Sequence, residues 1–274
     1  MAGPAARSFA ADPIGVIRAL PGHLRMQRFH DVPYELDENW DEHFHRTIGA
    51  PWPCTGARHV EELLAEISDL RAHHLSFGRQ AYGGYSDADL ALCRAVWCAV
   101  VHGQPDVVVE TGVARGVTSR IVLEAMMRVG RGHLYSIDLP HPFDQSLHAE
   151  IGVAVTDACK SRWTYLEGTS HDRLPELLRE KPDVQLFIHD SLHTAANTLF
   201  EMNQIAGVLS GGGMMIVDDI STHDGFATFT RQHPLFKMII CPSTDRNGLF
   251  GLAVKPRTAR SSPVREAISR GLRF

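Results

Sequence analysis

The 274-residue sequence lacks the features that mark several large classes of protein. Its five cysteines are scattered, without a CxxC pair or an even framework, so neither a zinc ribbon nor a disulfide scaffold is indicated. No apolar run approaches the roughly 20 residues of a membrane span, and residues 1–11 lack the apolar core of a secretory signal. The net charge of −5 offers no general attraction for nucleic acid. We therefore expect a cytoplasmic protein with reduced thiols and no membrane or nucleic-acid partner.

What is present is an ordinary globular composition, with 44% hydrophobic and 22% charged residues. Residues 1–85 are irregular and interrupted by prolines, apart from one helical apolar repeat over residues 59–74. We interpret residues 1–85 as a cap or lid segment, and residues 86–274 as the main domain. Ser86 is the expected N-cap of a buried helix over residues 90–101.

The main domain alternates short apolar runs with amphipathic helical stretches, a pattern typical of a parallel sheet covered on both faces. The last two apolar runs are joined by a loop too short for a helical crossover, so they should pair antiparallel. The sequence thus predicts an α/β, Rossmann-like, doubly wound and mostly parallel seven-stranded sheet with a C-terminal antiparallel hairpin. The expected strands are residues 107–109, 134–137, 163–166, 184–188, 214–217, 237–241 and 249–254.

The first of these strands runs into glycines and then into a helix. The glycines allow a sharp turn and a close approach of the backbone to a ligand. The spacing Glu-x-Gly-x-x-x-Gly is neither the GxGxxG dinucleotide fingerprint nor a phosphate-binding loop. A purely structural tight turn is the alternative. The candidate cofactor-binding residues of this segment are Glu110, Thr111, Gly112, Gly116 and Thr118.

Asp138 ends the next strand, 28 residues after Glu110. An ionised carboxylate at this edge offers two acceptor oxygens, which suits the two hydroxyls of a ribose. We therefore expect Asp138 to bind the sugar of an adenosyl group. Capping of the following loop is the alternative.

Three further acids follow the two apolar runs that should be central strands. Asp190 follows residues 184–188, next to the expected cofactor crevice, and is also a candidate cofactor-binding residue. Asp218 and Asp219 follow residues 214–217. If both runs are central strands, the three carboxylates meet at one sheet edge, and such like charges call for a cation with hard oxygen ligands, such as Mg²⁺. Separate strand-end caps are the alternative.

Glu110-Thr-Gly112, Gly116 and Asp138 together resemble the class I S-adenosylmethionine (SAM)-dependent methyltransferases, over about residues 86–255. The resemblance implies that the glycine turn passes beneath the methionine part of SAM and that Asp138 binds its ribose. It also implies that the loop after the third strand flanks the adenine, which would involve Thr169 and Ser170.

Asp190-Ser-Leu-His193 and the Asp218-Asp219 pair resemble a narrower group. It comprises metal-dependent O-methyltransferases acting on sugars of macrolide and aminocoumarin antibiotics, and the cephalosporin hydroxylase-like family. The resemblance implies that the acids hold Mg²⁺ and that His193 is the general base. His223 is the second candidate base or a substrate contact.

These features predict a SAM-dependent, Mg²⁺-assisted O-methyltransferase of secondary metabolism. Its partner would be a small hydroxylated acceptor, such as a sugar or another vicinal diol, and the resemblance implies a homo-oligomer. Methyl transfer from a sulfonium needs an oxygen nucleophile that is positioned and deprotonated, and a bound cation and a base supply both. Two alternatives remain open: a nicotinamide- or nucleotide-dependent oxidoreductase, and a non-catalytic methyltransferase-like binding protein.

Overall fold

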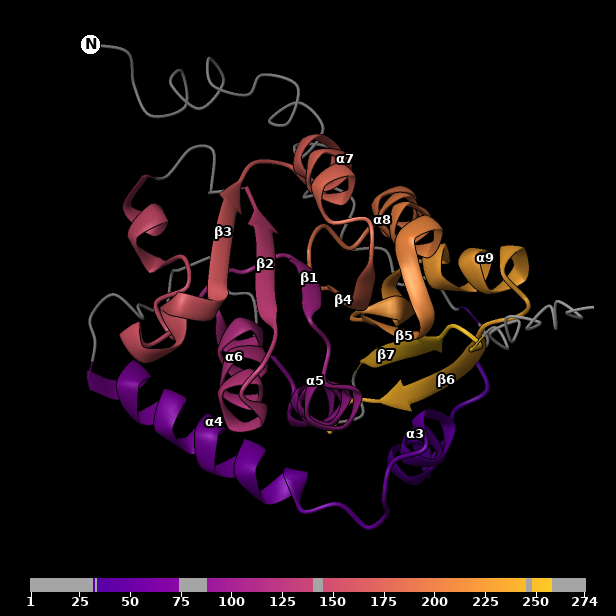
Figure 1. The fold of residues 1–274 in the computed structure, drawn as a ribbon, viewed down its shortest axis with the longest axis horizontal. Coiled ribbons are helices and arrows are strands. Elements are labelled where there is room, and N and C mark those ends of the chain that lie inside the picture. Colours follow the sequence, from indigo (N-terminus) through magenta and orange to yellow (C-terminus); the bar gives the residue numbers. More distant parts are fainter. Residues whose placement is uncertain (1–31, 33, 74–87, 140–144, 245–247, 258–274) are drawn as a thin grey trace, which may run out of the picture.

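The computed structural model describes residues 32, 34–73, 88–139, 145–244 and 248–257 (Figure 1). Within these ranges, seven strands form one sheet in the order β3-β2-β1-β4-β5-β7-β6. The first five strands in that order are parallel neighbours, and β7 runs antiparallel to both β5 and β6. The predicted fold class is therefore confirmed. The strands are β1 (Val107–Thr111), β2 (His133–Asp138), β3 (Trp163–Glu167), β4 (Val184–His189), β5 (Leu209–Val217), β6 (Lys237–Pro242) and β7 (Leu249–Val254).

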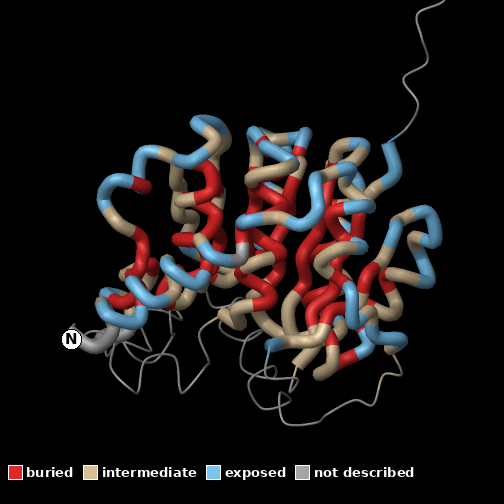
Figure 2. The backbone as a smooth tube through the Cα atoms, turned by 90° about the horizontal axis from the view of Figure 1, so that it is seen from below, coloured by how far each residue is buried: buried red, intermediate tan, exposed pale blue. Residues whose placement is uncertain are grey.

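Helices cover both faces of the sheet (Figure 1). Because side chains alternate along a strand, neighbours on β1 enter different cores: Val108 packs with α5 and α6, and Val109 packs with α7 and α8. Figure 2 shows buried residues in the interior segments and exposed residues at the outer turns. The helices are α3 (Trp40–Ile48), α4 (Gly56–His73), α5 (Leu90–Gly103), α6 (Val117–Val129), α7 (Ser170–Glu180), α8 (Ala195–Val208) and α9 (Gly225–Gln232).

The cap of α5 differs from the sequence prediction. The helix begins at Leu90, and Asp89 is its N-cap, accepting from the backbone N–H of Ala91 at 2.8 Å. Ser86, the predicted cap, lies outside the described residues and three positions too early. Aspartate is as good a cap as serine, because its carboxylate oxygen satisfies the free N–H groups of the first turn.

Two helices and part of a strand were not predicted. Helix α3 is short and mostly polar, and it lies within the segment expected to be irregular apart from residues 59–74. Helix α9 has eight residues, too few to show a clear apolar repeat. Strand β5 begins at Leu209, five residues before the predicted Met214, through a glycine-rich stretch that hides its strand character. None of the described helices is long and apolar enough to cross a lipid bilayer.

Candidate active site

The carboxyl ends of β1, β4 and β5 lie side by side, and the sheet hydrogen bonding continues past them. The backbone N–H of Asp190 donates to the carbonyl of Thr111, and that of Asp218 donates to the carbonyl of His189, each at 2.9 Å. This continuation fixes both aspartates at one edge of the sheet. A carboxylate oxygen of Asp190, one of Asp218 and a ring nitrogen of His193 all lie within 4.8 Å of one another. The structure thus brings together two of the predicted metal ligands and the predicted base.

Asp219 stands at the margin of this group. Its side chain is 43% exposed, and its Oδ2 lies 3.7 Å from Nε2 of His193. The same nitrogen lies 3.7 Å from Oδ1 of Asp190. The φ angle of Asp219 is +51°, in the left-handed region that aspartate tolerates better than most residues. This turn carries the chain away from the site immediately after the acidic pair.

Burial and mutual repulsion dominate the electrostatics of these acids. Burial and the charge of Asp218 raise the pKa of Asp190 well above its usual range. Burial and the charge of Asp219 raise the pKa of Asp218 to about 7. Burial lowers the pKa of His193 to about 4, against the opposing charge of Asp219. Negative charge is therefore costly at this edge, and a bound cation would relieve that cost.

The glycine turn is packed directly against the end of β4. Gly112 has a φ of +85°, and a Cβ there would lie only 1.9 Å from the carbonyl oxygen of Asp190. Gly116 has a φ of +80°, and a Cβ there would lie 2.8 Å from Cα of Gly152. Both glycines are therefore required by the protein's own packing. The contact at Gly112 sets the position of the turn relative to Asp190.

Replacing Gly112 with alanine should lower the free energy of unfolding by about 3 kcal/mol or more, because strain from positive φ adds to a collision with backbone. Gly130→Ala is the matched control, since Gly130 has a φ of +75° and, its chain neighbours and own helix aside, no atom of the described residues lies within 4 Å of the position that its new methyl group would take. It should cost only about 1 kcal/mol. Urea denaturation of the two variants measures the difference. Equal losses of unfolding free energy would show that the close contact with Asp190 does not add to the cost of the substitution.

Asp138 and Glu110 lie beside the turn. Oδ2 of Asp138 accepts from the backbone N–H groups of Val113 and Ala114, at 2.9 and 2.8 Å. Asp138 thereby holds the glycine turn, a role that the sequence did not indicate. Oε2 of Glu110 accepts from two serine hydroxyls at 2.6 Å, while its buried Oε1 has no hydrogen-bond partner among the described residues. Burial raises the pKa of Glu110 to about 7.

The other predicted cofactor residues make contacts within the protein. The hydroxyl of Thr111 donates to Glu201 at 2.6 Å. Thr118 is buried in the first turn of α6. Thr169 is the N-cap of α7, accepting from the N–H of Asp172. Ser170 is buried and donates to Asn197 at 3.3 Å. A ligand role for these four residues remains a prediction.

The sequence analysis missed Glu201, which lies on α8 and is fully buried behind the site. Its two oxygens accept from Thr111, His189, Ser191 and Asn197, at 2.6 to 2.9 Å. Burial alone would raise the pKa of Glu201, but the charge of His189 and these hydrogen bonds lower it to about 2. An ionised Glu201 thus fixes the ends of β1 and β4 from behind.

His223 belongs to the same buried network. Its Nδ1 accepts from the backbone N–H of Gly225 at 3.1 Å, so the ring proton is on Nε2, which lies 3.1 Å from Oγ1 of Thr198. Thr198 in turn lies 2.9 Å from Nε2 of His189. Because both ring nitrogens of His223 have partners inside the protein, His193 is the better placed of the two predicted bases.

The comparisons with known proteins agree with this geometry. Residues 109–220 match a family model described as a methyltransferase domain. That segment contains the glycine turn, Asp138, Asp190 and the acidic pair. A comparison with curated protein sequences finds no match.

The fold of this chain is similar to that of an O-methyltransferase from Bacillus cereus in complex with S-adenosylhomocysteine (SAH), at 14% identity and a TM-score of 0.51, covering 80% of this chain and 99% of that chain. It is equally similar to the O-methyltransferase TomG from Streptomyces achromogenes, involved in tomaymycin synthesis and in complex with SAM. The identity to TomG is 14% and the TM-score is 0.51, and the match covers 81% of this chain and 100% of TomG. The resemblance to class I methyltransferases is therefore confirmed at the level of the fold.

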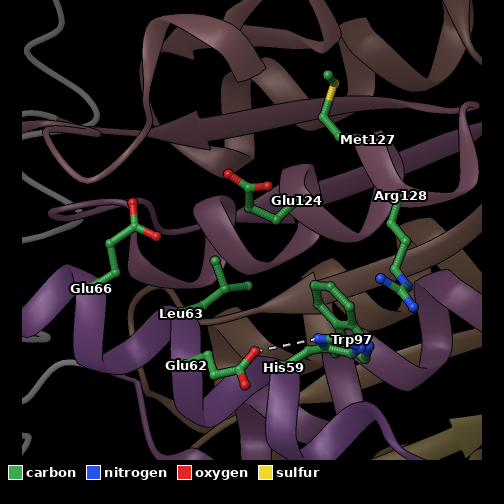
Figure 3. Close-up of a pocket in the computed structure, with 8 residues that line it drawn as sticks. All are labelled: His59, Glu62, Leu63, Glu66, Trp97, Glu124, Met127 and Arg128. Atoms are coloured by element: carbon green, nitrogen blue, oxygen red, sulfur yellow. Dashed lines mark ion pairs between the residues drawn. The ribbon is translucent and has the colours of Figure 1, made fainter.

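One pocket of about 390 Å³ lies away from the sheet edge, between α4, α5 and α6 (Figure 3). Acidic side chains from α4 and α6 line much of it, and His59 pairs with Glu62 at 3.6 Å. It contains none of the residues that converge at the carboxyl edge. The edge and not this pocket is therefore the candidate active site, because parallel α/β sheets bind ligands at the ends of their strands.

Proposed function

We propose that the protein is a SAM-dependent, Mg²⁺-assisted O-methyltransferase that acts on a hydroxyl of a small molecule, preferably a sugar or another vicinal diol. The observation that carries the proposal is the contact between Gly112 and Asp190. It places the glycine turn of a methyltransferase domain directly beside a group of carboxylates and a histidine. A methyl donor held by the turn and an acceptor held by the acids would be neighbours.

The residues beside the turn fit an adenosyl cofactor. Buried Oε1 of Glu110 has no hydrogen-bond partner among the described residues, which is costly unless a ligand donates to it. Asp138 lies at the neighbouring strand end and holds the turn through one oxygen. Glu110, Asp138 and the backbone of the glycine turn would therefore hold SAM. The SAM- and SAH-bound neighbours in the same fold support this assignment.

The acidic group fits a divalent cation. Asp190 and Asp218 converge, Asp219 adds a third negative charge, and hard carboxylate oxygens are the ligands that Mg²⁺ prefers. These three aspartates would hold the ion. When bound, Mg²⁺ would supply positive charge that favours the deprotonated form of an acceptor hydroxyl.

The chain's own residues would position the acceptor and take up its proton. Bound SAM would supply an electrophilic methyl group to the acceptor oxygen, and its sulfur would take up the electron pair of the broken carbon–sulfur bond. Nε2 of His193 accepts the hydroxyl proton. The resulting imidazolium is stabilised by the carboxylates of Asp190 and Asp219, each 3.7 Å from that nitrogen. Glu201 maintains this arrangement from behind the strands.

Titration calorimetry with SAH tests the cofactor assignment, and NADH is the control ligand for an oxidoreductase. We expect saturable binding of one SAH per chain and none of NADH. Release of SAH from SAM is then followed over a panel of vicinal diols and their mono-deoxy analogues, with Mg²⁺ added to protein prepared in metal-depleted buffer. Turnover should require Mg²⁺ and both hydroxyls. A folded protein that binds NADH and not SAH would refute the proposal.

A further inference from the structure

Two histidines and two cysteines far apart in the sequence lie close together where α3 and the loop before α4 pack against α5. His45 lies on α3, Cys54 lies in the loop before α4, and Cys98 and His102 lie on α5. One side-chain ligand atom from each lies within 4.8 Å of all the others. Cys98 and His102 are four residues apart and therefore point from the same face of α5. The cluster joins three separate segments of the chain.

The separations within the cluster match the edges of a tetrahedral metal site. Sγ of Cys54 lies 3.9 Å from Sγ of Cys98 and 3.3 Å from Nε2 of His102. Zinc bonds of about 2.3 Å to sulfur and about 2.0 Å to nitrogen give edges of about 3.8 Å between two sulfurs and about 3.5 Å between sulfur and nitrogen. A disulfide would need sulfurs about 2.0 Å apart, and both thiols are free in the structure.

His45 is oriented as a metal ligand would be. Its Nδ1 donates to the backbone carbonyl of Asp41 at 2.6 Å, which places the ring proton on Nδ1 and leaves a lone pair on Nε2. The residue is fully buried, and Nε2 faces the sulfurs of Cys98 and Cys54 without a hydrogen bond of normal geometry within the described ranges. Leaving such an acceptor unsatisfied is costly, whereas coordination would satisfy it. The carboxylate of Asp41 lies 3.2 Å from the same Nδ1 and forms an ion pair with Arg94. These contacts hold the imidazole ring in its orientation.

Cys54 is held in place by the start of α4. The backbone N–H of Gly56 donates to its sulfur at 3.2 Å, which fixes the position of the sulfur. A Cβ at Gly56 would lie 2.8 Å from the ring of Trp97, the residue next to Cys98, so the loop and α5 are in close contact here. The ligand set is therefore presented by packed backbone and not by freely rotating side chains.

We propose that His45, Cys54, Cys98 and His102 bind a zinc ion that fastens α3 and the loop before α4 to α5. Two thiolates and two imidazoles in tetrahedral array select zinc over Mg²⁺, and four protein ligands leave no open position, so the site is structural. It is separate from the acidic edge. Asp89, the N-cap of α5, is close enough to the edge for its charge to act on Asp218, and Cys98 is nine residues farther along the helix, or about 13 Å at 1.5 Å per residue.

Metal analysis of the purified full chain tests the proposal. Wild-type protein should contain about one zinc per chain after gel filtration, and Cys54→Ser and Cys98→Ser should each reduce that content at least tenfold. Cys159→Ser, which alters a buried thiol outside the cluster, and Asp218→Asn, at the acidic edge, should both retain the zinc. Cys54→Ser should also lower the melting temperature by about 10 °C, because a tightly bound ligand of the native state is lost.

Cobalt substitution keeps the test decisive if a serine variant unfolds. Wild-type protein loaded with Co²⁺ should show the visible bands of tetrahedral cobalt and a sulfur-to-cobalt charge-transfer band. His102→Cys should keep the metal and raise that charge-transfer band by about half, because three thiolates replace two. Wild-type protein that contains no zinc and gives no tetrahedral cobalt spectrum would overturn the proposal. So would three titratable thiols instead of five in denatured, unreduced protein, since that result indicates a disulfide.

Discussion

Glu201→Gln should lower the free energy of unfolding by about 3 kcal/mol. The buried carboxylate accepts from Thr111, His189, Ser191 and Asn197, and the glutamine amide would turn an NH₂ group toward donors. Removing one partner of a buried charged network leaves the others uncompensated, which accounts for the size of the effect. Urea denaturation near neutral pH measures it. Glu176→Gln is the control, because Glu176 is exposed and its loss should change stability by less than about 0.5 kcal/mol.

The effect of Glu201→Gln should also depend on pH. The folded-state pKa of Glu201 is about 2, below its ordinary value of 4.5. The ionised carboxylate therefore stabilises the fold fully above about pH 4.5, and this contribution is lost as the pH falls toward 2. The stability difference between wild type and variant should thus shrink below pH 4.5 in denaturation curves measured at successive pH values. A difference that grows on acidification would contradict an ionised Glu201.

Asp218→Asn should abolish divalent cation binding at the carboxyl edge and lower turnover about a thousand-fold, while leaving SAH affinity within about threefold of wild type. The amide keeps the shape of the side chain and removes the charge that acts on Asp190. Electron paramagnetic resonance of Mn²⁺, a spectroscopic substitute for Mg²⁺, measures binding without any need to know the acceptor. Asp224→Asn, at an exposed position six residues later, is the control and should bind Mn²⁺ as wild type does.

His193→Ala separates the two roles that its position allows. Nε2 of His193 lies among the acidic oxygens, where a ligand or a base can act. If His193 is a base, His193→Ala should leave Mn²⁺ binding unchanged and lower turnover by about a hundred-fold or more. His43→Ala, which removes a half-exposed imidazole on α3, should change neither. Loss of Mn²⁺ binding in His193→Ala would assign the histidine to the metal instead, and retained cation binding in Asp218→Asn would refute the acidic site.

The sheet was predictable because its strands are short apolar runs separated by helical repeats, and because the hairpin loop is too short for a crossover. The edge position of Asp190 and Asp218 followed from the same pattern. Helix α3 was not predictable, because Trp40 and Phe44 are the main apolar residues on its buried face. Such a short helix forms because of helical propensity and tertiary packing, and its sequence shows no clear apolar periodicity.

The residues behind and beside the edge were harder to find, because their partners are distant in the chain. Glu201 did give a signal: it lies four residues from Asn197 and four from Ile205, on the buried face of α8, where an acid must be paired. His45 and Cys98 gave none. Their separation of 53 positions fits no ligand-spacing rule, and the fold alone brings them together.

The contact between Gly112 and Asp190 means that neither of the two proposed ligand sites can shift without the other. A molecule that orders the turn thereby restricts the carboxylate across from it, and an ion that orders the carboxylate restricts the turn. Thermodynamic linkage makes this influence mutual. The factor by which SAH raises the affinity for the cation must equal the factor by which the cation raises the affinity for SAH. A single backbone contact would then be enough to make donor and cation bind cooperatively.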